Sequence, residues 1–334
     1  MIPVIPLIYQ KYAALCNRLL EHHASFSVID DYYHRYASGF QGEKSLDYYL
    51  EIVQDPYANW LKGLRLQYRH HFQIDRLYIT PAFMLLMEAK NITGTIYFDP
   101  HSRQLYRKIE NKEKVFSDPL LQVDLQAKQL RQVLTSANLP LMPMYTISVF
   151  TNPNAKLLLK DYQDRNRILT KQEIPFYIEL LMANHQTPQL SIDQWQSVMQ
   201  YLIDHHEEAD IDILKKFQIL WQDLLKGVRC PACSRLYMNR VRLSWQCPYC
   251  EHRSRDAHIP ALIELALLSN NLISNKLARE FLMVDSADAV NKMLVRAGLH
   301  KIGANKNARY QFELSRLTDK SIKVTDKRAI LTDK

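Results

Sequence analysis

The chain has 334 residues, of which 47% are hydrophobic, and a formal net charge of +8. This length allows two or three domains with packed cores, and no apolar run approaches the length of a membrane-spanning helix. The excess of Lys and Arg favours a polyanionic partner such as nucleic acid. Because the chain starts without the basic segment of a signal peptide, we expect a cytoplasmic protein.

Residues 1–37 are expected to form an N-terminal arm and helix. The opening MIPVIPLIY predicts a strand or arm that packs against the protein. Cys16 lies on the apolar side of the next segment, YQKYAALCNRLL, and is expected to be a buried core residue.

The segment GEKSLDYYLEIV predicts a helix, because its apolar residues recur at helical spacing. Glu43 lies on the same inward stripe as Leu46 and Leu50, where a carboxylate needs a partner. Two roles for Glu43 are open. It is either a first-turn residue favoured by the helix dipole or part of a metal or catalytic site.

Residues 72–90 predict a β-hairpin. The runs 72–79 and 83–90 are rich in β-branched, aromatic and apolar residues, and Thr80-Pro81 separates them. Two antiparallel strands joined by a tight turn follow from this pattern. The hairpin is otherwise apolar, so its charged residues need a physical reason.

The expected register brings three of these charges together. If Ile79 pairs with Met84, Asp75 lies directly opposite Glu88. Lys90 then points to the same side as Glu88, because side chains alternate along a strand. Two carboxylates therefore face each other with a lysine beside them.

Opposed carboxylates repel each other, because their Cβ atoms lie roughly 4.5–5.5 Å apart. A cation between them removes the repulsion, and carboxylate oxygens suit hard ions such as Mg²⁺ or Mn²⁺. A lysine beside the ion can orient an attacking water or stabilise phosphate charge. The pattern favours metal-dependent phosphodiester hydrolysis. The alternative is an ordinary cross-strand ion pair at a sheet edge.

A further helix is expected after Ser117. Either Ser117 or Asp118 can cap it, and Pro119 suits its first position. Gln122 and Gln126 share a polar face, which by itself predicts solvent-exposed residues. The residues expected on its core side are Leu121, Leu125, Val133 and Leu134.

Residues 39–150 resemble the nuclease-related domain (NERD), a branch of the PD-(D/E)xK nuclease superfamily. The family has a helix-borne Glu after a Gly, an Ile-Asp strand, an E-x-K strand and a Gln on the next helix. The counterparts here are Glu43, Asp75, Glu88, Lys90 and Gln122. After the lysine, Ile92 stands where the family more often has an aromatic residue.

The resemblance implies an α/β fold with a restriction-endonuclease-like core, in which helices flank a mixed central sheet, over residues 38–153. It also implies that Asp75 and Glu88 bind a catalytic Mg²⁺ or Mn²⁺. Lys90 would position the water or stabilise charge, with Glu43 and Gln122 assisting. Residues 154–225, broken by prolines, are expected to form a mostly helical linker region.

Residues 226–258 predict a zinc ribbon. Cys230-Pro-Ala-Cys233 and Cys247-Pro-Tyr-Cys250 are separated by 13 residues, a spacing typical of structural Zn²⁺ sites with four cysteine ligands. The intervening residues predict a short hairpin. The alternative is a redox dithiol pair, which would need a thioredoxin-like context that the sequence lacks.

The ribbon region is basic and aromatic, which suits a nucleic-acid backbone and stacked bases. The alternative is a solvated surface on a ribbon that docks against protein. The residues expected to contact nucleic acid are Arg235, Arg240, Arg242 and Trp245.

Residues 259–316 predict a helix-turn-helix-like domain similar to winged-helix folds. Ser274 and Ser286 can cap its second and third helices, and the third ends near Gly298. Lys292 and Arg296, one turn apart, could face a phosphate or a groove. A wing-like pair of strands follows. The alternative is a small helical packing domain without DNA contact.

Together these features predict a metal-dependent nuclease acting on DNA, or on RNA, with the ribbon and C-terminal helices aiding binding. The alternative is a non-catalytic nucleic-acid-binding or regulatory protein built on a nuclease-like fold. A double-strand cut by one site per chain would require a homodimer. Residues 317–334 are polar and expected to be disordered.

Overall fold

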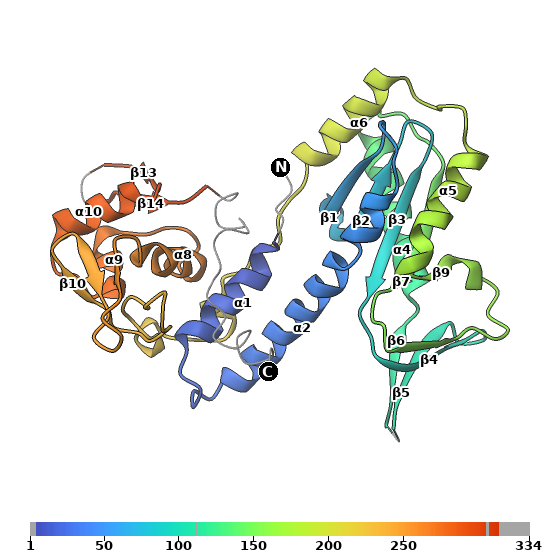
Figure 1. Ribbon diagram of the computed structural model, residues 1–334. Helices are drawn as coiled ribbons and strands as arrows, with labels where there is room; N and C mark the ends of the chain where they lie inside the picture. The colour runs from blue at the N-terminus through green and yellow to red at the C-terminus, as the bar shows by residue number, and fades with distance from the viewer. Residues whose placement is uncertain (1–4, 111, 305–306, 314–334) are drawn as a thin grey trace. The chain divides into compact units, whose positions relative to one another are not determined.

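The computed structural model describes residues 5–110, 112–304 and 307–313 (Figure 1). The predicted tail at 317–334 lies outside these residues. The chain forms two compact units. The first contains residues 37–208, and the second combines residues 3–36 with residues 209–334 as far as they are described. Among the described residues, no helix has the length and apolar character needed to cross a membrane.

The first unit is built on a mixed five-stranded sheet with the order β1-β2-β3-β7-β9. Its strands are β1 (Asn59–Tyr68), β2 (His70–Ile79), β3 (Met84–Lys90), β7 (Met144–Phe150) and β9 (Ile168–Thr170). Neighbours are antiparallel from β1 to β3 and parallel from β3 to β9. The predicted mixed central sheet flanked by helices is confirmed.

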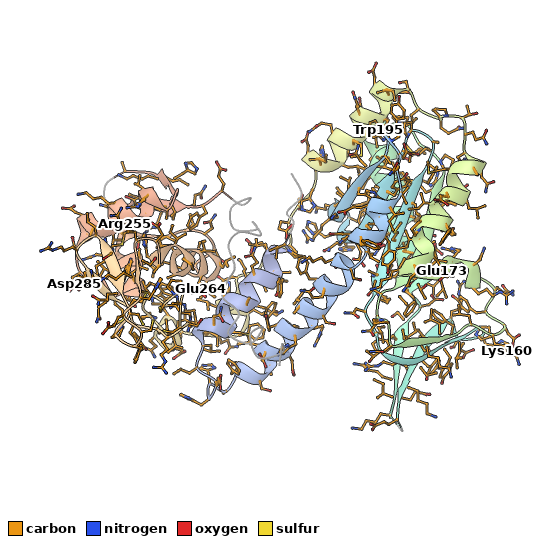
Figure 2. The ribbon with its side chains drawn as sticks, in the orientation of Figure 1. Lys160, Glu173, Trp195, Arg255, Glu264 and Asp285 are labelled. Atoms are coloured by element: carbon orange, nitrogen blue, oxygen red, sulfur yellow. The ribbon has the colours of Figure 1, made fainter. Side chains whose placement is uncertain are left out.

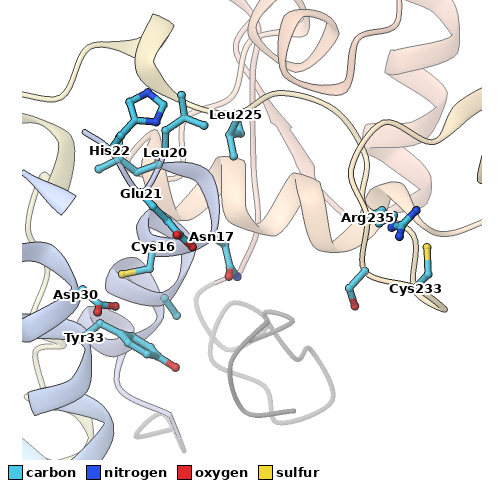
Figure 3. Close-up of a pocket in the computed structure, with 13 residues that line it drawn as sticks. Cys16, Asn17, Leu20, Glu21, His22, Asp30, Tyr33, Leu225, Cys233 and Arg235 are labelled. Atoms are coloured by element: carbon cyan, nitrogen blue, oxygen red, sulfur yellow. The ribbon is translucent and has the colours of Figure 1, made fainter. Parts of the chain in front are cut away.

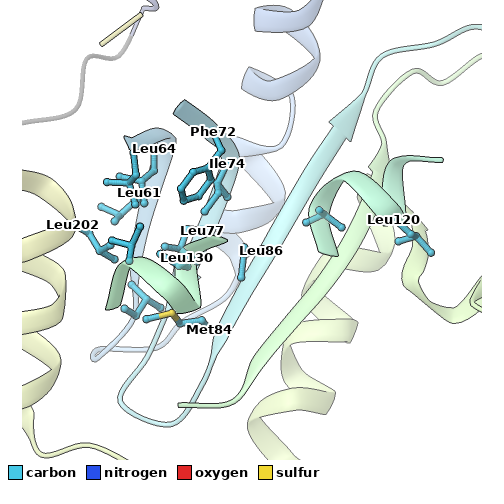
Figure 4. Packing of buried hydrophobic residues seen from close by; sticks show 14 of the residues in the cluster. Leu61, Leu64, Phe72, Ile74, Leu77, Met84, Leu86, Leu120, Leu130 and Leu202 are labelled. Atoms are coloured by element: carbon cyan, nitrogen blue, oxygen red, sulfur yellow. The ribbon is translucent and has the colours of Figure 1, made fainter. Parts of the chain in front are cut away.

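Helices cover both faces of this sheet. On one face, Leu77 and Leu86 pack in a cluster with Leu130 of α4 (Pro119–Ser136), as Figure 4 shows, and with side chains of α6 (Ile192–Asp204). On the other face, α3 (Asp47–Ile52) and α5 (Ile174–Asn184) cover Tyr78 and Leu85. Glu88 lies on the first of these faces, where Gln126 of α4 contacts it.

The first half of α4 turns a different side to the core than predicted. Leu121 and Leu125 are exposed, whereas Leu120, Val123 and Leu130 are buried. Val133 and Leu134 are buried as expected. Because Asp118 accepts the N–H of Leu120 as the cap, the helix starts at Pro119 with Leu120 turned inward.

A four-stranded sheet with the order β6-β5-β4-β8 completes the first unit. Its strands are β4 (Gly94–Asp99), β5 (Gln104–Ile109), β6 (Lys112–Ser117) and β8 (Ala155–Leu158). Strands β8 and β9 lie in the region that we expected to be mostly helical, so that expectation was partly wrong. These two strands are short and pair in parallel with β4 and β7, and three to four residues carry no periodicity that a sequence could reveal.

The second unit is mainly helical. Its helices are α1 (Leu7–Arg18), most of α2 (Phe26–Lys44), α7 (Ile213–Lys216), α8 (His258–Leu268), α9 (Asn275–Leu282) and α10 (Ala287–Arg296). Its strands are β10 (Asn239–Val241), β11 (Ser244–Gln246), β12 (Arg253–Ser254), β13 (His300–Ile302) and β14 (Arg309–Gln311). The short 3-10 turns η1 (Arg165–Arg167) and η2 (Lys171–Glu173) belong to the first unit and η3 (Trp221–Asp223) to the second.

The start of the chain was predicted as a strand or arm, yet the residues from Leu7 onward are helical. Helix α1 ends at a buried ion pair in the second unit, where Arg18 Nε donates to Glu264 Oε2 at 2.6 Å. Glu264 is labelled in Figure 2. Arg18 Nη1 also donates to the carbonyls of Leu225 and Gly227. This side chain therefore ties α1 to α8 and to the segment that leads into the first cysteine pair.

Candidate functional site

The predicted hairpin has the predicted register. Ile79 pairs with Met84 and Leu77 with Leu86, so continuing the ladder places Asp75 opposite Glu88. The turn is closed by Thr80, whose hydroxyl oxygen accepts the N–H groups of residues 82 and 83. A tight turn without a flexible loop holds the two carboxylate positions in register.

Asp75 lies at a distortion of the sheet. Its Oδ2 accepts the N–H of Ala89 at 2.9 Å, so a side chain replaces the main-chain acceptor here. On the other side, Gly63 of β1 lies opposite Asp75 with a φ of 61°, a left-handed conformation that favours glycine. Burial, and the nearby carboxylates of Glu88 and Glu43, raise the pKa of Asp75 well above its usual range.

Glu88 is 3% exposed, and both of its oxygens have partners. Lys90 Nζ donates to Oε1 at 2.6 Å, and Gln126 Nε2 donates to Oε2 at 3.1 Å. Lys90 Nζ also donates to Gln122 Oε1 at 3.0 Å. The structure therefore brings Glu88, Lys90 and Gln122 together on one face, beside Asp75.

Gln126 is a functional candidate that sequence reasoning missed. It was placed on a polar face and taken as solvent-exposed, but it is 5% exposed and contacts Glu88. Its spacing of four from Gln122 was the available signal, because residues four apart lie on one side of a helix. Among the described residues, neither Gln126 Oε1 nor the buried Oγ of Ser148, which pairs with Glu88 across β3 and β7, has a hydrogen-bond partner.

Glu43 lies in the last turn of α2 and not in the first turn of a helix. The predicted start was wrong because α2 begins at Phe26 and runs through Gly39 and Gly42, residues with low helix propensity. Arg76 supplies the partner that Glu43 needs, with Nη1 3.0 Å from Glu43 Oε2. Burial raises the pKa of Glu43, and the Arg76 guanidinium opposes that shift.

Gly42 sets how closely α2 approaches the strands. A Cβ atom at this position would lie 2.6 Å from Asn91 Cβ and 2.9 Å from Thr151 Oγ1. These residues directly follow β3 and β7. A glycine is therefore needed for the end of α2 to hold Glu43 near Asp75 and Glu88.

The four cysteines of the predicted ribbon converge in the second unit. All four Sγ atoms lie within 4.8 Å of one another. The Sγ atoms of Cys230 and Cys250 are 3.7 Å apart, and those of Cys233 and Cys247 are 3.5 Å apart. A tetrahedral ion with zinc–sulfur distances of about 2.3 Å separates its sulfur atoms by about 3.8 Å. The thiol set therefore fits a zinc ion.

The two cysteine pairs have the same backbone geometry. The N–H of Cys230 donates to the carbonyl of residue 235, and the N–H of Cys247 donates to the carbonyl of residue 252. In each pair the carbonyl of the first cysteine accepts an N–H four residues later, from Ser234 or Glu251, and both of these residues have a φ of 59°. Strands β10 and β11 form the predicted hairpin between the pairs.

Trp245 was expected to stack on bases, and this expectation is wrong. Its side chain is 1% exposed, and its Nε1 donates to Nδ1 of His258 at 3.2 Å. The Arg240 guanidinium lies 5.3 Å above the same ring. Trp245 alternates inward on β11 and packs against the start of α8, so no base can reach its face.

Four of the other candidate contacts are exposed, whereas Arg240 is half-buried over the Trp245 ring. Arg235 is exposed and lies 4.9 Å above the ring of Tyr249, and Arg242 is exposed at the turn between β10 and β11. Lys292 and Arg296 are exposed on α10, with Arg296 3.6 Å from Asp256. These side chains present positive charge at the surface of the second unit.

The helices after the ribbon follow the predicted order. The Ser274 hydroxyl accepts the N–H of Leu277 and the Ser286 hydroxyl accepts that of Ala289, so both serines are helix caps. Gly298 follows α10 with a φ of 82°. Strands β13 and β14 pair after it, as expected for a wing.

A cavity of about 690 Å³ also lies in the second unit (Figure 3). Cys16, which was expected in the core, is half-buried on its wall, and Glu21 and Asp30 line it as well. The zinc-ligand candidate Cys233 and its neighbour Arg235 complete one side. None of the carboxylate-site residues lines this cavity.

The carboxylate site lies in a part of the chain that matches a known family model. Searches of the curated proteins and of the solved structures found no match. Residues 38–151 match the family model of the nuclease-related domain. This segment contains Glu43, Asp75, Glu88, Lys90 and Gln122, and the cysteine cluster lies outside it. Over residues 38–151 the chain is thus similar to the nuclease-related domain.

Proposed function

We propose that this domain is a divalent-metal-dependent nuclease that hydrolyses phosphodiester bonds in DNA. The observation that supports the proposal is the group formed by Asp75 and Glu88 on adjacent strands, with Lys90 2.6 Å from Glu88. Gln122 on α4 holds the same lysine from the other side. Two carboxylates and an anchored cation on one face match the needs of phosphate chemistry.

The donor set fits a hard cation. Asp75 and Glu88 offer carboxylate oxygens, which Mg²⁺ and Mn²⁺ prefer. Burial, and then repulsion from the nearby carboxylates, raises the pKa of Asp75, and positive charge at this place relieves the repulsion. Asp75 and Glu88 would hold the ion. When bound, it would polarise the phosphate and lower the pKa of a bound water.

The chain's own residues position the reacting groups. Lys90 Nζ donates to Gln122 as well as to Glu88, so the amide can keep the lysine in place when Glu88 has another partner. The ammonium group can then donate to the attacking water or stabilise the negative charge that develops on the phosphate. Gln126 donates to Glu88 Oε2 and fixes the plane of that carboxylate.

Glu43 acts through Arg76 in this proposal. Arg76 is 4% exposed and binds both the carboxylate and the backbone carbonyl of Glu43. It also donates to the carbonyl of Asp75, the residue before it. Glu43 therefore supports the strand that carries Asp75, and its negative charge adds to the field that attracts a cation.

The second unit serves substrate binding in this proposal. A structural zinc ion on the four cysteines would hold the ribbon. The exposed side chains Arg235, Arg242, Lys292 and Arg296 would contact the phosphate backbone, which needs no base recognition. Trp245 has no part in this contact.

Cleavage assays test the proposal. Supercoiled plasmid, labelled linear single- and double-stranded DNA, and RNA are incubated with Mn²⁺, Mg²⁺ or EDTA, and Glu88→Gln is purified identically as the control. Metal-dependent cleavage by the wild type that is lost in Glu88→Gln is expected. If neither protein cleaves but both bind nucleic acid, the non-catalytic alternative replaces the proposal.

A further inference from the structure

On one face of the hairpin of β5 and β6, every charged residue that the register places there is basic. The register pairs Arg107 directly with Lys114, and Ile96 of β4 lies on the other side of Arg107 in the same row. Lys112, two residues before Lys114, points the same way because side chains alternate. We define the basic face as Arg107, Lys112 and Lys114.

The register gives this face no compensating acid. Like charges placed directly opposite each other in a sheet are destabilising, and Arg107 faces Lys114 in this way. On the opposite face of the same strands, Lys108 pairs with Glu113, which also accepts a hydrogen bond from Tyr97 at 2.8 Å. The outer face is balanced in charge, whereas the basic face concentrates one sign.

The basic face lies on the same side of the first unit as the carboxylate site. Ile96, in the row of Arg107, belongs to the apolar cluster that includes Leu86 and Leu130 on the α4 side of the central sheet. Glu88 and Lys90 contact glutamines of α4 on that same side. In Figure 1 the sheet of β4, β5 and β6 lies beyond the end of β3 that carries the site.

A hydrogen bond links the basic face to the site. Arg107 Nε donates to the carbonyl of Thr93 at 3.1 Å. Thr93 lies in the short segment that connects Lys90, the last residue of β3, to β4. The Arg107 guanidinium is thus held at the exit of the strand that carries Glu88 and Lys90.

We propose that the basic face binds the phosphate backbone of the nucleic-acid substrate beside the position of cleavage. This inference rests on the proposed function and extends it to the strand that flanks the scissile phosphate. Lysine and arginine side chains that neutralise phosphates release counterions, so their contribution is independent of sequence and falls with salt. Repulsion between Arg107 and Lys114 is relieved when a polyanion lies across them.

The test uses full-length protein with Glu88→Gln in the background and no added Mg²⁺ or Mn²⁺, so that binding is measured without cleavage and without a chelator that would remove zinc. Lys112→Gln/Lys114→Gln is compared with Lys108→Gln/Lys156→Gln, which removes two charges from the outer face. We expect the basic-face pair to weaken binding of duplex DNA about tenfold. The slope of the logarithm of the binding constant against the logarithm of the salt concentration (the salt slope) should fall in magnitude by about 1.8, or about 0.9 per contact. The outer-face pair is expected to change neither.

Equal effects of the two pairs, or no effect of the basic-face pair, would overturn the inference. Thermal unfolding of each variant checks the fold, and Lys114→Gln alone is expected to raise the midpoint because it removes the charge opposite Arg107. The binding measurement tests this inference and the cleavage measurement tests the proposed function, so either can fail without the other. If the wild type cleaves DNA and the basic-face pair keeps its salt slope, only this inference fails. If the slope falls but no protein cleaves, only the nuclease proposal fails.

Discussion

The two candidate metal sites of this chain differ in the protein groups that surround their ligands. In the cysteine cluster four thiols converge, with every sulfur atom within 4.8 Å of the others. In the carboxylate site each ligand has a protein partner, because Asp75 accepts the Ala89 N–H and Glu88 accepts from Lys90 and Gln126. The cysteine ligands all face one point, whereas the carboxylate ligands are held by an amide N–H, a lysine and a glutamine.

This difference separates a structural role from a catalytic one. A closed site with four cysteines has no open position for chemistry, and its metal contributes directly to folding. The carboxylates are also held by protein groups, so in the proposed nuclease we expect the fold not to depend on the catalytic ion. Variants of the two sites can break this contrast, and removal of a thiol is expected to have the largest effect.

Removing a thiol from the cluster should abolish zinc binding and unfold the ribbon. Structural zinc contributes about 10–16 kcal/mol in small domains, so Cys233→Ser should lose its metal. Elemental analysis measures the zinc content, and limited proteolysis reports folding around residues 226–258. Cys16→Ser is the matched control, because Cys16 lies outside the cluster. Stoichiometric zinc in Cys233→Ser would refute a structural site with four cysteine ligands.

Lys90→Met should separate metal binding from chemistry. The loss of an electrostatic donor aimed at developing charge typically slows catalysis about 10²–10³-fold. Metal affinity should rise, because Glu88 loses the ammonium group that competes for its oxygen. Single-turnover cleavage and calorimetric Mn²⁺ titration measure the two effects, with Lys108→Met as control. Cleavage at the wild-type rate would sink the role given to Lys90.

Gly42→Ala should show that the close approach of α2 to the strands supports the carboxylate site. Its Cβ atom would collide with Asn91 and Thr151, and overpacking of this kind costs about 1–3 kcal/mol. Gly39→Ala is the matched control in the same helix, since its Cβ atom meets nothing within 4 Å. That substitution should stabilise the protein by about 0.5–1 kcal/mol. Urea unfolding measures whether each substitution lowers or raises the free energy of unfolding. Equal changes in the two variants would contradict a collision specific to residue 42.

Asp75→Asn should give the smallest change and remove a pH dependence. The pKa of Asp75 is raised in the folded state, so the folded protein binds this proton more tightly than the unfolded chain does. The free energy of unfolding therefore falls as pH rises from the ordinary pKa through the raised one. In EDTA at neutral pH we expect Asp75→Asn to raise the unfolding midpoint by a few degrees.

The same variant should no longer be stabilised by Mn²⁺, because it lacks one ligand charge. Thermal unfolding between acid and neutral pH, with Mn²⁺ or EDTA, measures both effects. Asp124→Asn, which changes a half-exposed carboxylate away from the pair, is the control. If the unfolding midpoint of Asp75→Asn depends on pH as that of the wild type does, the pH dependence does not come from Asp75.

Short-range patterns allowed the hairpin and its charges to be predicted. The Thr80-Pro81 turn and strict alternation determine the register, so Asp75 and Glu88 could be placed opposite each other from the sequence. Serine caps at 274 and 286 were likewise readable, because a cap bonds within three residues. The resemblance to the nuclease-related domain added the set of candidate residues.

Contacts between distant residues could not be predicted. Arg76 meets Glu43 across 33 positions, and Gln126 meets Glu88 across 38. Trp245 lies among arginines in the sequence, which suggested a surface, but its burial depends on how β11 packs against His258. Each of these outcomes is decided by tertiary packing, and no local spacing encodes it.

Strand β3 lies in the interior of its sheet, paired with β2 on one side and with β7 on the other. The pairing with β2 ends at Met87, whereas the pairing with β7 continues through Glu88 to Lys90. Glu88 is therefore fixed by β7 on one side and by Gln126 of α4 above it. If the proposed nuclease is regulated, we expect the regulator to act on access of the ion or the nucleic acid, because the ligands themselves are held by the sheet and the helix.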